Sequence, residues 1–145
     1  MAEQTTSSLD VAADPASVMS VIADFESYPS WATGVKSAEV ISSYPDGRAR
    51  EVSFVLDAPP IEDEYTLLYQ WDGVARVSWS LVRATMLKAM AGAYILRPRG
   101  ESTQVSYQLT IDLTIPMIGM LKRKGEKVII ETALKGLRQR VESRS

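Results

Sequence analysis

The sequence predicts an α+β fold, in which a curved antiparallel sheet of about seven strands wraps around a long C-terminal helix. Three features predict it: a strand pattern followed by two short helices near the N-terminus, a block of six strand patterns, and a long amphipathic helix at the end. Strands in one block with helices outside it are typical of α+β proteins and not of parallel βαβ folds. We expect residues 1–145 to form a single domain.

The first elements are a strand and two short helices. Thr5–Val11 has the composition of a strand and is followed by Asp14-Pro15, where Asp suits a helix cap and Pro the first helical position. Apolar residues at helical spacing then predict a helix. We expect a second short helix over Asp24–Tyr28, closed by Pro29, with Trp31 just beyond it.

The six strands that follow are separated in part by tight-turn signals, at Pro45–Gly47, Asp72-Gly73 and Pro98–Gly100. Residues alternate between apolar and polar along the later strands, so we expect one buried and one solvated face, as in an antiparallel sheet covered on one side. The residues predicted to face inward include Tyr65, Leu67, Tyr69, Trp71, Val77, Trp79, Leu81, Val105, Tyr107, Leu109 and Ile111.

The last element is a predicted helix from about Pro116 to Ser143. Its deep apolar stripe leads back, at helical spacing, to Glu126 and Lys122, which are four residues apart and can form an ion pair. These two side chains either hold the polar end of a ligand or extend to water at the rim of the core. The stripe consists of Ile130, Ala133, Leu134, Leu137 and Val141.

Apolar residues in three long links predict a cavity between the sheet and the last helix. A meander reverses at every joint, so residues 57–63, 83–90 and 112–117 should gather at the end opposite the tight turns. Apolar loops are unusual, and Met adapts to irregular partners. We predict the mouth of an apolar pocket here, with Lys88, Lys122, Arg123 and Lys124 around it; alternatively, the same residues plug the end of the core.

Two arginines are candidate polar groups of this pocket. Arg50 shares the inward parity of Val52 and Phe54, and Arg83 shares that of Leu81. Each either meets a carboxylate or enol oxygen of a ligand or bends out to solvent. The predicted lining residues are Trp31, Phe54, Tyr65, Tyr69, Trp79, Tyr94, Met86, Met90, Met117, Met120, Lys122, Glu126, Ile130, Arg50 and Arg83.

Composition limits the chemistry. The chain has no cysteine, which excludes disulfides and thiolate chemistry, and no histidine, the commonest proton-transfer group near neutral pH. We therefore expect no metal and no cofactor, and we favour binding over catalysis, although enzymatic activity stays open. The net charge of −2, the absence of a long apolar run and the polar N-terminus predict a cytoplasmic protein without nucleic-acid binding or stable membrane insertion. Oligomeric state is not readable from the sequence.

Five sequence patterns carry a resemblance to a known family: residues 24–31 (DFESYPSW), 71–73 together with 77–79, 92–94, 103–107 and, most distinctively, 116–124 (PMIGMLKRK). With this order of elements, the chain resembles the START-like superfamily called SRPBCC, especially small actinobacterial proteins of the polyketide cyclase/dehydrase or coenzyme-Q-binding-like kind. The resemblance implies a helix-grip fold with a cavity for lipids, polyketides, quinones or sterol-like ligands, and it supplies no universal catalytic motif.

Three functions follow as hypotheses. The first is binding or transport of a hydrophobic small molecule such as a lipid, a quinone or a polyketide-like compound. The second is a polyketide aromatase/cyclase, in which Arg50 or Arg83 stabilises an enolate and Tyr65 or Tyr94 relays a proton. The third is a module that binds a protein partner through an exposed apolar patch.

Overall fold

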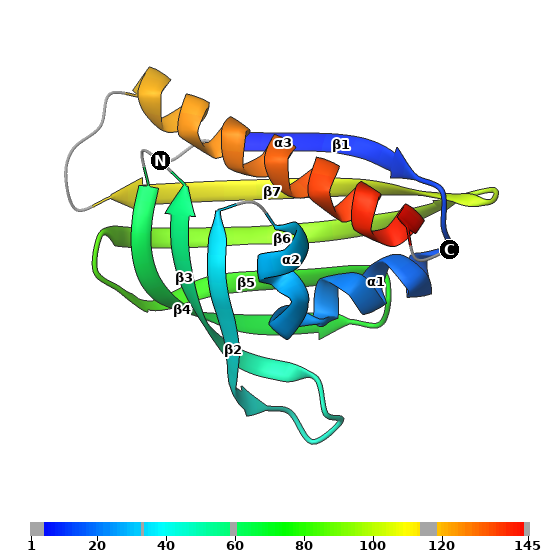
Figure 1. The fold of residues 1–145 in the computed structure, drawn as a ribbon, viewed down its shortest axis with the longest axis horizontal. Helices are drawn as coiled ribbons and strands as arrows, with labels where there is room; N and C mark the ends of the chain where they lie inside the picture. The colour runs from blue at the N-terminus through cyan, green and yellow to red at the C-terminus, as the bar shows by residue number, and fades with distance from the viewer. Residues whose placement is uncertain (1–4, 33, 59–60, 114–118, 144–145) are drawn as a thin grey trace.

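The computed structural model describes residues 5–32, 34–58, 61–113 and 119–143, without the side chains of 58, 61, 113 and 119–122. Within these ranges the chain forms a curved sheet covered on one face by helices, as expected (Figure 1). The strands are β1 (Thr5–Val11), β2 (Val35–Ser43), β3 (Ala49–Ala58), β4 (Ile61–Asp72), β5 (Arg76–Ala84), β6 (Leu87–Arg99) and β7 (Ser102–Leu113). The helical elements are α1 (Pro15–Ala23), the 3₁₀ turn η1 (Phe25–Ser27), α2 (Tyr28–Trp31) and α3 (Gly119–Ser143).

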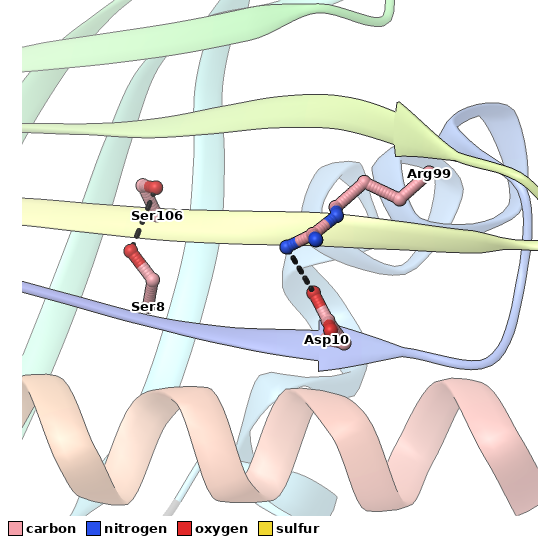
Figure 2. A network of polar contacts seen from close by, with 4 residues as sticks. All are labelled: Ser8, Asp10, Arg99 and Ser106. Atoms are coloured by element: carbon pink, nitrogen blue, oxygen red, sulfur yellow. Dashed lines mark hydrogen bonds and ion pairs between the residues drawn. The ribbon is translucent and has the colours of Figure 1, made fainter.

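The sheet is antiparallel throughout, with the order β1-β7-β6-β5-β4-β3-β2. The N-terminal strand β1 lies beside β7, with Ser7 opposite Tyr107. Figure 2 shows two exposed contacts on this side of the sheet: the hydroxyls of Ser8 and Ser106 lie 2.8 Å apart, and Arg99 reaches Asp10 at 3.9 Å. Such exposed contacts contribute little energy, but they agree with the register of β1 on β7.

The three predicted tight turns are confirmed by their glycines. Gly47, Gly73 and Gly100 have φ angles of +92°, +54° and +65°, in the region that only glycine adopts without strain. These turns keep successive strands adjacent, so β2 to β7 form a simple meander.

β-Bulges bend the sheet into a concave surface. The register shifts between β2 and β3, between β4 and β5, and between β6 and β7. An extra residue on one strand bends that strand and increases its twist. As a result, β2 and β3 run across the direction of β6 and β7, and α1, α2 and α3 lie on the same side of the sheet (Figure 1).

The second helical segment after β1, formed by η1 and α2, differs from the prediction at Pro29. A helix closed by Pro29 is wrong, because η1 leads directly into α2, which continues to Trp31. Pro29 lies in the first turn of α2, where a missing backbone N–H costs no helical hydrogen bond. Phe25 and Tyr28 are therefore buried under this short helical stretch, and Trp31 belongs to its last turn.

Helix α3 buries the apolar stripe predicted for it. Ile130, Leu134, Leu137 and Val141 are buried and Ala133 is half-buried, while residues 116–118 of the predicted helix lie outside the described ranges. At Gly136 a Cβ would lie 2.5 Å from the carbonyl oxygen of Trp31, so this glycine permits close approach of α3 and α2. None of the described helices is long and apolar enough to cross a membrane.

Candidate functional site: an aromatic cavity

A cavity of about 180 Å³ lies between the concave face of the sheet and α3. Its floor comes from β3 to β7, and its cover from α3, α2 and the start of β2. No residue with a formal charge is among the described residues that line it. These residues are Tyr28, Trp31, Ala32, Gly34, Val35, Phe54, Leu56, Tyr65, Leu67, Tyr69, Trp79, Met90, Tyr94, Tyr107, Val128, Ile129, Thr132 and Ala133.

The floor is a continuous array of aromatic rings. Phe54 stacks on Tyr65, with ring centroids 5.4 Å apart and ring planes 20° from parallel. The ring centroid of Trp79 lies 5.8 Å from that of Tyr69, 5.5 Å from that of Tyr94 and 5.4 Å from that of Tyr107, which it meets edge to face. Aromatic pairs at these distances hold one another in place beyond the effect of burial alone. The cavity therefore has a preformed aromatic wall.

Gly92 makes room for the central ring of this wall. A Cβ built at Gly92 would lie 2.6 Å from Trp79 Cζ2 and 2.7 Å from the carbonyl oxygen of Gln108. The indole can cover β6 at this point because Gly92 has no side chain. The Gly92–Tyr94 segment, one of those that carry the family resemblance, thus has a direct role in shaping the cavity.

The tyrosine hydroxyls give this wall its polar character. Tyr28 donates a hydrogen bond to the carbonyl oxygen of Ile22. For Tyr65, Tyr69, Tyr94 and Tyr107, in contrast, the described part of the chain offers the hydroxyl no hydrogen-bond partner. Burial raises the pKa of all five tyrosines, and the nearby Tyr107 raises the pKa of the other four further. The hydroxyls therefore stay neutral at physiological pH.

The described rim of the cavity lies between α3 and the segment that joins α2 to β2. Gly34, Val35, Ile129 and Thr132 are half-buried, and Val128 is 49% exposed although it lines the cavity. Of the predicted basic rim, Lys88, Arg123 and Lys124 are exposed. The opening as described is therefore apolar and runs beside the middle of α3.

The link between β5 and β6 is held by a buried carboxylate. Asp63 is only 7% exposed, and its carboxylate accepts four hydrogen bonds of 2.8 to 3.0 Å from backbone N–H groups. Glu64 and Thr85 donate to Oδ1, and Met86 and Leu87 donate to Oδ2. The side chain of Met86 lines a separate surface hollow, together with Lys36 and Asp57, and not the cavity. No pattern in the sequence indicated this role for Asp63.

Glu126 is fully buried, yet it does not line the cavity. Its carboxylate accepts hydrogen bonds from the backbone N–H of Ile111 at 2.7 Å and from the hydroxyl of Thr5 at 2.8 Å. The carboxylate thus ties α3 to β7 and β1, and the prediction that Glu126 extends to water at the rim is wrong. The side chain of its predicted partner, Lys122, lies outside the described residues.

The two arginines do not face inward, because β-bulges interrupt the alternation. Arg83 lies opposite Thr66, whereas Leu81 lies opposite Leu67. Val82 is therefore an extra residue in β5, and beyond it the side chains that would have pointed inward point outward. Arg50 is the extra residue between Ala49 and Glu51, which pair with Ser43 and Ser42. Both arginines are exposed and absent from the described lining.

The structure brings together only part of the predicted set. Trp31, Phe54, Tyr65, Tyr69, Trp79, Met90 and Tyr94 line the cavity, whereas Ile130 is buried elsewhere in the core. Met117 and the side chain of Met120 lie outside the described residues. The lining residues missed include Tyr28, Leu67 and Tyr107, although the inward parity of the last two was clear. The consecutive Val128, Ile129 and Ile130 signalled that the apolar stripe of α3 widens toward the cavity.

Among the residues that the structure describes, no cluster of acidic side chains is arranged to hold a metal ion. The chemical resources of the cavity wall are aromatic faces, aliphatic groups, neutral hydroxyls and the unpaired Nε1–H of Trp31. Such a wall suits noncovalent binding of an apolar molecule with few polar groups.

The family described as polyketide cyclase / dehydrase and lipid transport matches residues 2–142. Because the match spans almost the whole sequence, the chain belongs to this family, and the START-like resemblance is confirmed. Its fold is the START-like, polyketide-cyclase type associated with hydrophobic ligands. No curated protein matches the chain.

Solved structures agree with this assignment of the fold. A START superfamily protein from Mycobacterium smegmatis superimposes with a TM-score of 0.92 at 21% identity, covering 98% of this chain and 99% of that one. A protein from Thermus thermophilus gives 0.82 at 26% identity and 99% coverage of both chains. The Zhui aromatase/cyclase from a Streptomyces species gives 0.78 at 13% identity, covering 99% and 96%.

Proposed function

We propose that this protein binds or transports an apolar small molecule in the aromatic cavity, without catalysing a reaction on it. The observation that carries the proposal is the cavity itself: about 180 Å³, walled by aromatic and aliphatic side chains and free of charge in its described lining. Apolar surface gains roughly 25 cal/mol for each Å² removed from water, so such a wall favours an apolar ligand without any specific polar contact.

The cyclase alternative loses the two arginines assigned to it. Stabilising an enolate needs a cation or oriented donors next to the developing charge. Arg50 and Arg83 are exposed and absent from the described lining, and the chain has no histidine to act as a base. Tyr65 and Tyr94 remain in the cavity, but burial raises the pKa of both, which makes them poor proton acceptors near neutral pH.

The first test is native mass spectrometry, with solvent extraction, of the protein purified from its own host. We expect a discrete extra mass that disappears on denaturation. A clean apo mass, together with no thermal shift across lipids, quinones and aromatic polyketides, would contradict the binding function.

A cavity-filling variant tests whether the ligand occupies this site. Ala133 lies on α3 and lines the cavity, so the ring of Ala133→Phe should take up ligand space and weaken binding at least tenfold, or about 1.4 kcal/mol. Lys135→Phe adds the same ring at an exposed position of α3 and serves as the control. Titration calorimetry with the extracted ligand measures both. Equal affinity in the two variants would place the ligand elsewhere.

A further inference from the structure

The size of the cavity limits what it can hold. At about 180 Å³ it is only slightly larger than an engineered apolar cavity of about 150 Å³ that binds benzene. Drug-sized ligands usually occupy pockets of roughly 300–1,000 Å³. The described cavity therefore accommodates a compact molecule of one or two fused rings, and a long acyl chain or a four-ring skeleton exceeds it.

The shape and chemistry of the wall favour an aromatic ligand. Trp79 lies at the centre of the floor, between Tyr69 on one side and Tyr94 and Tyr107 on the other. These rings constrain one another, so the wall presents fixed ring faces and edges instead of flexible chains. A planar aromatic ligand completes such an array in offset or edge-to-face contacts, which contribute beyond simple burial.

The described lining offers neutral hydrogen-bond donors but no cation to pair with an ionised ligand. The two buried carboxylates near the core already accept hydrogen bonds: Asp63 from four backbone N–H groups, and Glu126 from Ile111 and Thr5. Arg50 and Arg83 are exposed and outside the described lining. Because burying an unpaired carboxylate is costly, acidic ligands are disfavoured.

The tyrosines supply the polar recognition. The hydroxyls of Tyr65, Tyr69, Tyr94 and Tyr107 have no hydrogen-bond partner within the described ranges, and none of them is among the fully buried unpaired atoms there, so they are open to the cavity. The Nε1–H of Trp31, which also lines the cavity, is buried without a partner, and such a donor normally makes a hydrogen bond. A hydroxyl both donates and accepts, so a ligand oxygen in a phenol, ketone or quinone satisfies one or more of them. A site built in this way discriminates against analogues that lack the oxygen.

We infer that the cavity selects an uncharged aromatic molecule of one or two fused rings that carries a hydroxyl or carbonyl oxygen, and that the tyrosine hydroxyls of its wall, those of Tyr94 and Tyr107 included, determine this specificity. The inference rests on the proposed binding function and names its ligand class. It excludes fatty acids and aromatic carboxylates. Such acids would have paired with Arg50 and Arg83 if these side chains had faced inward as predicted.

Four probes of defined chemistry test the inference by titration calorimetry with the full chain: naphthol, naphthalene, naphthoate and dodecanoate. We expect naphthol to bind about tenfold more tightly than naphthalene, because it adds a hydrogen bond to the cavity wall. Naphthoate should bind about 100-fold more weakly than naphthol because its charge must be buried unpaired. Dodecanoate should show no saturable binding.

Tyrosine variants test the assigned residues. In Tyr94→Phe/Tyr107→Phe, which leaves the hydroxyls of Tyr65 and Tyr69 in place, naphthol affinity should fall toward that of naphthalene, while naphthalene affinity stays unchanged. Tyr44→Phe is the matched control, since it removes a hydroxyl that donates to the carbonyl oxygen of Tyr69 and does not line the cavity. If the double variant loses affinity for both probes equally, the hydroxyls act through folding and the assignment of Tyr94 and Tyr107 is wrong.

The outcomes separate this inference from the proposed function. Tighter binding of naphthoate or dodecanoate than of naphthol would overturn the ligand class and leave the binding function standing. The class is also overturned if naphthol fails to bind while a different ligand copurifies with the protein. If none of the four probes binds and the protein carries no extra mass, the binding function fails as well.

Discussion

Two buried acidic residues show how a charged side chain can serve the fold alone. Asp63 and Glu126 are as buried as the apolar core, yet each carboxylate receives hydrogen bonds from groups that would otherwise be unpaired. A carboxylate in such a position is favourable because the donors replace its lost hydration. Burial of an acidic residue is therefore not, in this protein, a sign of an active site.

Replacing Asp63 should destabilise the protein strongly. In Asp63→Ala the backbone N–H groups of Thr85, Met86 and Leu87 lose their acceptor, so we expect the free energy of unfolding to fall by about 2–4 kcal/mol. Urea denaturation measures the change. Asp57→Ala is the control, since Asp57 makes an exposed ion pair with Lys36 and its loss should matter little. Equal stability of the two variants would show that Asp63 does not hold the link.

At the scale of elements, the two glycines Gly125 and Gly136 of α3 allow the effect of helix propensity on stability to be distinguished from the effect of packing. Gly136 lies against the backbone of Trp31, whereas a Cβ at Gly125 would meet nothing within 4 Å. Both glycines are interior to the same helix, and each costs roughly 1 kcal/mol relative to alanine from propensity alone. One of them therefore has a packing reason to be glycine, and no such reason is visible for the other.

Alanine substitutions at these two positions should have opposite effects. Gly125→Ala should raise the free energy of unfolding by about 0.5–1 kcal/mol. Gly136→Ala should lower it by about 1–3 kcal/mol, because α3 must move away from α2 to relieve the contact with Trp31. Thermal and urea denaturation measure both. A stabilised Gly136→Ala protein would mean that α2 yields easily, and that the described approach of the two helices is unimportant.

Helices, strands and turns could be predicted where short-range sequence signals determine them. Which face of the sheet a side chain lies on could be predicted only within stretches of strand that contain no β-bulge. The strand over residues 5–11, the three glycine turns and the apolar stripe of α3 follow from short-range pattern. Parity counting predicted that Trp79 and Tyr107 face inward, and both side chains are buried under the helices. It failed for Arg50 and Arg83, because a single extra residue in a strand reverses every later side chain and leaves no mark in the sequence.

At the scale of the molecule, the cavity and the core share the same tyrosines. Burial raises the pKa of Tyr28, Tyr65, Tyr69, Tyr94 and Tyr107, so folding must keep all five neutral. In the unfolded chain tyrosine loses its proton at about pH 10. Above that pH the unfolded state binds fewer protons than the folded state, so stability falls as pH rises.

The protein should therefore unfold cooperatively in alkali. Below about pH 10 these tyrosines add no pH dependence, and above it each removes up to about 1.4 kcal/mol of stability per pH unit. Urea denaturation at increasing pH measures the slope, and tyrosinate absorbance reports ionisation. The slope should be shallower in Tyr94→Phe/Tyr107→Phe, which removes two of the groups. Ionisation of more than one of the six tyrosines in a protein that stays folded would contradict the burial of these five hydroxyls.

The position of the indoles has a practical consequence. The chain has three tryptophans: Trp31 and Trp79 border the cavity, whereas Trp71 stands outside it and donates its Nε1–H to the carbonyl oxygen of Ala49. The ring of Tyr69 lies 5.9 Å from Trp71 and 5.8 Å from Trp79, and that of Tyr28 lies 4.8 Å from Trp31. Excitation energy absorbed by these tyrosines is therefore transferred to neighbouring tryptophans, two of which border the cavity, so a ligand bound in the cavity would change the tryptophan fluorescence.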